Sequence, residues 1–153
     1  MDLASLHSAY PRLMERAPAV YLTTCGSGGY PHTRAMLNLR NRRQYPDQAR
    51  LFAGHEADLM VYFTTTTSSG KILELKADPR ASAYYCDPAR FHGVMLGGDL
   101  QIVDDSWLRR ALWKAGWECY YPGRPDDPDH TILRLLPTVV TGWHKTSRSA
   151  FRP

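Results

Sequence analysis

The segment 61–88 constrains the fold most, because it encodes a strand, a hydroxyl-rich turn, a short helix and a second strand in succession. Residues 61–64 (V-Y-F-T) are β-branched and aromatic, which favours a strand over a helix. A threonine- and serine-rich turn follows, and the helical pattern runs from near Ser69 to Asp78-Pro79, because a residue before proline avoids the α region. Residues 81–86 then return to strand composition.

The start of this predicted helix combines features that suit an anion. Unpaired backbone N–H groups and a partial positive charge gather at a helix N-terminus, and Ser68, Ser69 and Lys71 add two hydroxyls and an ammonium. The same residues also fit an ordinary capped surface helix with a solvated lysine. A nucleotide P-loop fits poorly, because Thr65 replaces its first glycine and Ile72 replaces its magnesium-binding hydroxyl.

Size and composition indicate one globular domain over residues 1–153. The chain is 43% hydrophobic and 22% charged, close to the norm for globular proteins. The net charge of +4 comes from arginines that are mostly spread along the chain, apart from Arg40, Arg42 and Arg43. This charge distribution favours anionic small molecules as ligands over nucleic acid bound on a dedicated surface.

The cysteines indicate a cytoplasmic protein. Cys25, Cys86 and Cys119 are an odd number at wide spacing, which supports neither a disulfide framework nor a zinc site. We also expect no signal peptide and no membrane-spanning segment, because no apolar run is long enough.

Several short strands alternate with two or three helices in the rest of the chain. Apolar spacing predicts an N-terminal helix within residues 1–17, with Asp2 as N-cap and a bend or break near Pro11. The remaining expected elements are a hairpin of strands 19–24 and 32–39, an exposed polar loop at 41–50, a strand at 91–103, a helix from 106 to about 115, strands at 131–136 and 139–144, and a mobile tail at 146–153. About six such strands predict an antiparallel sheet that closes as a barrel to remove its edges.

Three aromatic or charged side chains have two open interpretations each. Arg34 lies in the middle of its strand, where it is either an edge or interface arginine or a phosphate ligand. Trp113 and Trp117 either pack in the core or line a ring-shaped ligand. In the helix 106–115, the stripe Trp107, Leu108, Ala111 and Leu112 is expected to be buried.

The common catalytic constellations are missing from the sequence. Six histidines lie far apart without metal-ligand spacing, and neither a G-x-S-x-G elbow nor a local signature for a cysteine nucleophile occurs. We therefore predict no metal site and assign no catalytic residue. Any reactivity would come from a bound cofactor, held through its phosphate.

The chain resembles the pyridoxamine 5'-phosphate oxidase-like superfamily of FMN-binding split β-barrels, particularly its small general-stress and uncharacterised flavoprotein branch. The likeness rests on four places that follow the family's order along the chain. They are 33–36 (T-R-A-M); 63–65 with 69–71 (S-G-K); 78–81 (D-P-R-A) with 85–88 (Y-C-D-P); and 98–105 followed by Trp113, Trp117, 121–123 (Y-P-G) and 127–129 (D-P-D).

The resemblance implies a mainly β protein with a few helices, an antiparallel split barrel that forms a homodimer with FMN at the subunit interface. It assigns Arg34, Ser69 and Lys71 to the phosphate, and the backbone around residues 35–37 and 64–65 to the flavin ring. The full expected cofactor-binding set is Arg34, Ala35, Met36, Leu37, Thr64, Thr65, Ser68, Ser69, Gly70 and Lys71.

Two departures bear on activity. Gly70 stands where the vitamin-synthesising oxidases have an arginine, and the segment 144–149 lacks their R-x-H pattern, so we do not expect pyridoxamine phosphate oxidation. The resemblance implies an FMN-dependent oxidoreductase that acts on an unidentified small substrate. The alternatives are a flavin-binding stress or sensor module with little turnover, and a relative that binds F420 or haem.

Overall fold

The structure is a computed structural model that describes residues 3–153; Asp2, the expected N-cap, lies outside the described residues. The N-terminal helix α1 (Leu3–Arg16) continues through Pro11 without a break. Proline removes one backbone donor from a helix. Burial of Tyr10, Leu13 and Met14 against the sheet holds both halves of α1 in place.

Apart from α2 and β8, the strands and helices lie close to the predicted segments. The strands are β1 (Val20–Cys25), β2 (Pro31–Met36), β3 (Val61–Thr66), β4 (Arg80–Asp87), β5 (His92–Val103), β6 (His130–Leu135), β7 (Val139–His144) and β8 (Ser147–Phe151). The other α-helices are α2 (Pro46–Ala49), α3 (Gly70–Ala77) and α4 (Ser106–Leu112). Short 3-10 turns lie at Ser27–Gly29, Arg50–Phe52, Pro88–Arg90, Trp117–Cys119 and Arg124–Asp126.

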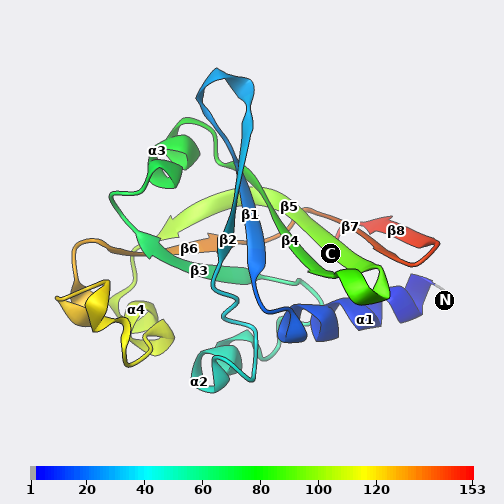
Figure 1. Ribbon diagram of the computed structural model, residues 1–153, viewed down its shortest axis with the longest axis horizontal. Coiled ribbons are helices and arrows are strands. Elements are labelled where there is room, and N and C mark those ends of the chain that lie inside the picture. The colour runs from blue at the N-terminus through cyan, green and yellow to red at the C-terminus, as the bar shows by residue number, and fades with distance from the viewer. Residues whose placement is uncertain (1–2) are drawn as a thin grey trace.

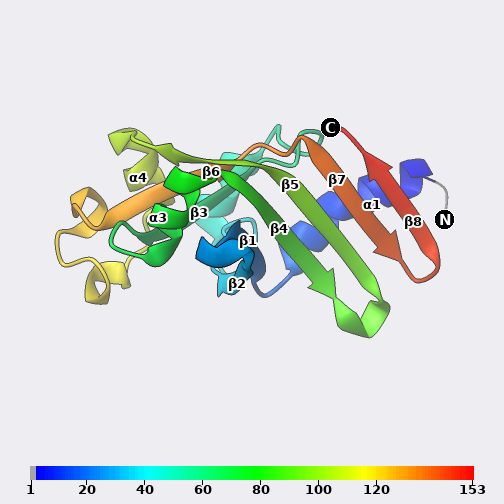
Figure 2. The ribbon, with the colours of Figure 1, turned by 90° about the horizontal axis from the view of Figure 1, so that it is seen from above.

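The described strands form one antiparallel, curled sheet, a split β-barrel (Figure 1). Six strands follow the order β2-β1-β4-β5-β6-β3, so β2 and β3 lie at its two ends. The long strand β5 pairs with β7 through residues 92–97 and with β6 through residues 100–103, which joins the two parts of the sheet. Figure 2 shows β7 and β8 extending this sheet on the side where α1 lies.

Two hydrophobic clusters support the sheet. The main cluster lies inside the half-barrel, where α1 packs onto inward-facing residues of six strands, among them Leu22, Phe63, Leu96 and Leu133. The second cluster gathers Leu39, Phe52 and Trp117 with Leu112 of α4 and Ile132 of β6. Alternating side chains on a strand point to opposite faces, so single strands such as β6 serve both clusters through Leu133 and Ile132.

The segment 41–50 is not the exposed loop that its polarity predicted. Asn38 Nδ2 donates to the carbonyls of Met14 and Ala17 at 2.6 and 2.8 Å, and Asn41 Nδ2 donates to Ala17 at 3.0 Å. These amides pair with carbonyls at the end of α1 that have no partner within the helix. Part of the loop is therefore buried, and Pro46–Ala49 forms α2.

Two further expectations need correction. The tail from 146 is not mobile, because Ser147–Phe151 forms β8, pairs with β7 and buries Ser149. In α4, Leu108 and Leu112 are buried as expected, but Trp107 is 65% exposed. The helix ends at Leu112, before the expected end near residue 115, and Trp107 in its first turn faces the solvent.

Candidate cofactor site at the start of α3

Helix α3 lies at one end of the β1–β2 hairpin, directly after β3 in the chain (Figure 1). Its N-cap is Ser69, whose carbonyl accepts the first helical bond from the N–H of Ile72 at 3.0 Å. The Ser69 hydroxyl makes no capping bond to the helix backbone. It faces Lys71 instead, so the predicted turn presents its hydroxyl and its ammonium together.

Two hydroxyl groups hold the Lys71 ammonium. Its Nζ donates to Thr65 Oγ1 at 2.7 Å and to Ser69 Oγ at 3.1 Å. Among residues 3–153, no carboxylate forms an ion pair with this ammonium. Burial lowers the pKa of Lys71, and the nearby Arg34 charge lowers it further, while Glu74 raises it. The site therefore has an excess of positive charge beside the helix start.

Arg34 reaches the same region from β2. Its Nη1 donates to Thr24 Oγ1 at 2.6 Å and to the His32 carbonyl at 2.9 Å, and its Nη2 donates to Glu74 Oε2 at 3.0 Å. The mid-strand arginine thus has a carboxylate partner. Because Glu74 lies on α3, the two predicted phosphate ligands, Arg34 and Lys71, converge on one helix.

Glu74 is the centre of this hydrogen-bond network. Its carboxylate accepts from Arg34, pairs with His32 Nδ1 at 2.6 Å and also accepts from the Thr24 hydroxyl. Burial alone would raise its pKa. The hydrogen bonds from Thr24, His32 and Arg34 outweigh this and lower the pKa of Glu74 to about 2. Glu74 is therefore ionised at neutral pH.

Ser68 and Gly70 differ in what they offer a ligand. The Ser68 N–H and hydroxyl bond to Asp129 Oδ1 and Oδ2 at 2.8 and 3.2 Å. These bonds hold Ser68 against the loop before β6. At Gly70, a Cβ would meet no atom within 4 Å, so the backbone beside Lys71 borders open space.

The residues expected beside the flavin ring lie on the two end strands of the sheet. On β2, Ala35 is exposed and Met36 packs against the main core, while Leu37, just beyond the strand, is 43% exposed. On β3, Thr65 bonds to Lys71, whereas Thr64 pairs with His130 Nε2 at 2.9 Å. Among the residues expected beside the flavin ring, Thr65 is therefore the one whose side chain bonds to Lys71.

Sequence reasoning missed Glu74, His32 and Asp129. Glu74 follows Lys71 by three residues, so helical periodicity places both side chains on one face, and this signal was available. The contacts of His32 and Asp129 depend on pairing across the fold. Trp117 is buried and Trp113 packs beside it against Tyr121 and His130, which agrees with packing as the role of both rings.

The described residues contain no cluster of three or more potential metal-ligating side chains, and none of their helices has the length and apolarity needed to cross a bilayer. A phosphate group fits beside Lys71, because a half-buried ammonium without a carboxylate partner adjoins the open backbone at Gly70.

Comparison with solved structures identifies relatives with the same fold. One is a protein from Clostridium acetobutylicum related to general stress protein 26, of the pyridoxine phosphate oxidase family. It is 28% identical, the match covers 99% of this chain and 96% of the relative, and the TM-score is 0.76. The general stress FMN/FAD-binding protein of Xanthomonas citri has 18% identity, 94% and 92% coverage and a TM-score of 0.68.

A haem-binding protein from Mycobacterium smegmatis also shares the fold, with 15% identity, 99% and 60% coverage and a TM-score of 0.68. A search of curated protein sequences found no significant match. The model of the family described as pyridoxamine 5'-phosphate oxidase matches residues 6–144. With this match over most of its length and its split-barrel architecture, the chain belongs to the pyridoxamine 5'-phosphate oxidase family.

Proposed function

We propose that the chain binds FMN at the start of α3 and acts as a flavin-dependent oxidoreductase on a small substrate. The observation that carries this proposal is Lys71, whose ammonium contacts two hydroxyls and, within residues 3–153, no carboxylate, and which lies near the Arg34 guanidinium. An anion would relieve the repulsion between these two cations. The flavin-binding relative from Xanthomonas citri supports FMN as that anion's source.

In this proposal the phosphate binds to Lys71, Arg34, Ser69 and the backbone at Gly70. The backbone of residues 35–37 and 64–65 borders the flavin ring. Ser68 contributes through its place in the turn, because its hydroxyl is already bonded to Asp129. Bound FMN supplies the hydride or electron transfer, and the protein groups orient it and exclude water.

We further propose a homodimer with FMN at the subunit interface. Strands β2 and β3 each pair with one neighbour only, β1 and β6 respectively, so each leaves one edge without a strand partner in the described chain. Unpaired edges favour association. Tyr30 beside β2 is 75% exposed and Leu37 after it is 43% exposed, which gives this edge apolar surface for a second copy.

The free cysteines, Cys25, Cys86 and Cys119, support a cytoplasmic location, where thiols stay reduced.

We do not expect pyridoxamine phosphate oxidation, because Gly70 and the segment 144–149 depart from the vitamin-synthesising enzymes. A haem-binding relative makes haem the second candidate cofactor. An absorption spectrum of the purified protein separates the candidates: flavin bands support FMN, whereas a Soret band supports haem. A colourless protein that takes up F420 would support deazaflavin binding.

Lys71→Ala tests the FMN site by flavin fluorescence titration. Loss of a charge-assisted hydrogen bond should weaken FMN binding by about 1.5–3 kcal/mol. Lys76→Ala is the matched control, since Lys76 is an exposed lysine in the last turn of the same helix. Equal FMN affinity in the two variants would reject the site.

Bleaching of the bound flavin by NADH or NADPH, with turnover only when an acceptor is present, would distinguish an enzyme from a sensor.

A further inference from the structure

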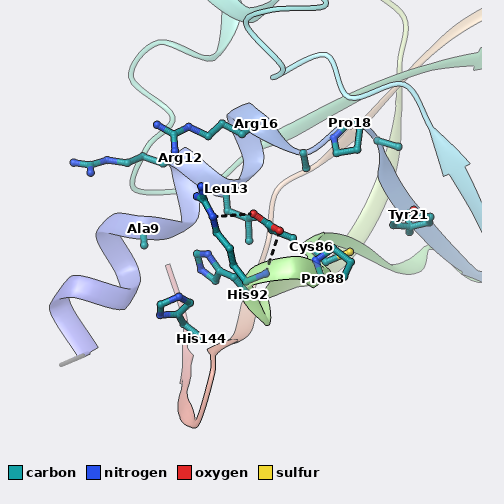
Figure 3. A pocket seen from close by; sticks show the side chains of 14 residues that line it. Ala9, Arg12, Leu13, Arg16, Pro18, Tyr21, Cys86, Pro88, His92 and His144 are labelled. Atoms are coloured by element: carbon teal, nitrogen blue, oxygen red, sulfur yellow. Dashed lines mark hydrogen bonds and ion pairs between the residues drawn. The ribbon is translucent and has the colours of Figure 1, made fainter.

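A separate cleft of about 640 Å³ lies between α1, the start of β1, and the turn that joins β4 to β5 (Figure 3). We call it the α1 cleft. Its volume falls in the range of small-molecule sites. Leu13, Pro18 and Pro88 give it apolar walls, and Tyr21, His92 and His144 add three rings.

The rim of the α1 cleft is strongly basic. Arg12, Arg16 and Arg90 line it together with one acidic residue, Asp87. Asp87 Oδ2 lies 3.6 Å from Arg90 Nε, so its charge is already balanced. The exposed side chains of Arg12 and Arg16 project from α1, and neither forms an ion pair among the ten found in residues 3–153. Two cations therefore remain for a ligand.

The rings of His92 and His144 form one wall of the α1 cleft. Their ring centroids are 4.9 Å apart in an edge-to-face arrangement, and Figure 3 shows them side by side below α1. Burial lowers the pKa of His92, and His144 lowers it further, so the His92 ring is neutral near pH 7. His92 Nε2 is buried without a hydrogen-bond partner in the described chain. A neutral ring suits stacking against an aromatic group.

The α1 cleft and the α3 site lie on different faces of β1. Successive side chains of a strand point to opposite faces. Tyr21 is exposed and lines the cleft, whereas Leu22 and Thr24 are buried, and Arg34 bonds to Thr24. In Figure 1, α1 and α3 lie at opposite ends of this strand.

We propose that the α1 cleft binds a small aromatic anion, a carboxylate or a phosphate ester, with its ring against His92, His144 and Tyr21 and its charged group at Arg12 and Arg16. This binding site is independent of the proposed FMN site. Charge complementarity selects the anionic group, and the apolar walls with three rings select the aromatic body.

Calorimetric titration of the full chain with 2-naphthoate and 2-naphthyl phosphate tests this proposal, with neutral 2-naphthamide as the matched probe. At least one anion should bind saturably and more tightly than the amide, and the tighter anion identifies the charged group. The double variant Arg12→Ala/Arg16→Ala should weaken that binding at least tenfold. The control Arg43→Ala/Arg152→Ala removes the same charge from exposed arginines outside the cleft and should bind as the wild type does.

Repeating the titration with FMN added to saturation separates the two sites. Unchanged naphthoate or naphthyl phosphate affinity supports an independent cleft. Competition by FMN would place the probe in the flavin site and overturn the proposal. Equal weakening in both double variants would show a general charge effect, and it would overturn the proposal too, as would the absence of saturable binding by either anion.

Discussion

Glu74 on α3 and Arg34 on β2 form an ion pair of 3.0 Å that links the two ends of the six-strand path. Helix α3 directly follows β3, and no strand pairing between β2 and β3 occurs in residues 3–153. Thr24 and His32 bond to the same carboxylate, so Glu74 connects the β1–β2 hairpin to the helix. The split of the barrel is thus bridged by side chains at the place where we propose that FMN binds.

Glu74→Gln should tighten FMN binding. The carboxylate competes with a phosphate for Arg34 and repels it, whereas glutamine keeps hydrogen-bonding capacity without the charge. We expect an increase in affinity of about threefold, typical of a partly screened charge interaction. Flavin titration measures it, with Glu56→Gln as a control at an exposed glutamate. Weaker binding in Glu74→Gln alone would mean that Glu74 orients Arg34 for the cofactor.

The same residue should make the protein sensitive to acid. The pKa of Glu74 falls from 4.5 to about 2 on folding, so its stabilising contribution is complete above about pH 4.5 and is lost as the pH falls toward 2. Urea unfolding of wild type and Glu74→Gln at several pH values measures this contribution. The wild type should be more stable at pH 7, and the difference should shrink between pH 4.5 and 2. A difference independent of pH would contradict the assignment.

Arg40→Met should destabilise the fold, because Arg40 is a buried cation that binds backbone carbonyls. Arg40 is 2% exposed and donates to the Met60 carbonyl from Nε and Nη2 and to the His55 carbonyl from Nη2. Its loss leaves the Met60 carbonyl unpaired, at about 1–3 kcal/mol when buried, and removes one of the two donors to the His55 carbonyl, which keeps its bond from the Leu59 N–H. Urea denaturation should show a loss of at least about 2 kcal/mol, against little change for Arg43→Met on the exposed part of the same segment. Equal stability of the two variants would show that water replaces the guanidinium.

Two buried tyrosines should respond in opposite directions to loss of the hydroxyl. Tyr85 is fully buried, and its hydroxyl has no partner in the described chain, whereas the Tyr10 hydroxyl bonds to Ser149 Oγ. Tyr85→Phe should raise the free energy of unfolding by about 1 kcal/mol, and Tyr10→Phe should lower it by a similar amount. Thermal or urea unfolding measures both. A loss of stability in Tyr85→Phe would reveal a bound water or partner at this hydroxyl.

The sequence by itself determined the local helices and strands, and it indicated an anion-binding turn at the start of α3. The β-branched residues of 61–64, the turn at 65–70 and Pro79 fixed β3, α3 and the start of β4, and the family resemblance placed them in a split barrel. Lys71, Ser69 and Thr65 are close in sequence, so a single turn brings them together. Their proximity was predictable because it depends on local geometry alone.

Only the tertiary structure decided the partners of these groups. Arg34 and Glu74 are separated by forty residues in the chain, and their contact depends on how the sheet curls to bring β2 beside α3. The polar segment 41–50 became partly buried because its amides meet the end of α1, and 147–151 became a strand because β7 offered an open edge. Polarity and turn signals describe a segment's own preference. Burial and pairing depend on which surface the rest of the chain presents to it.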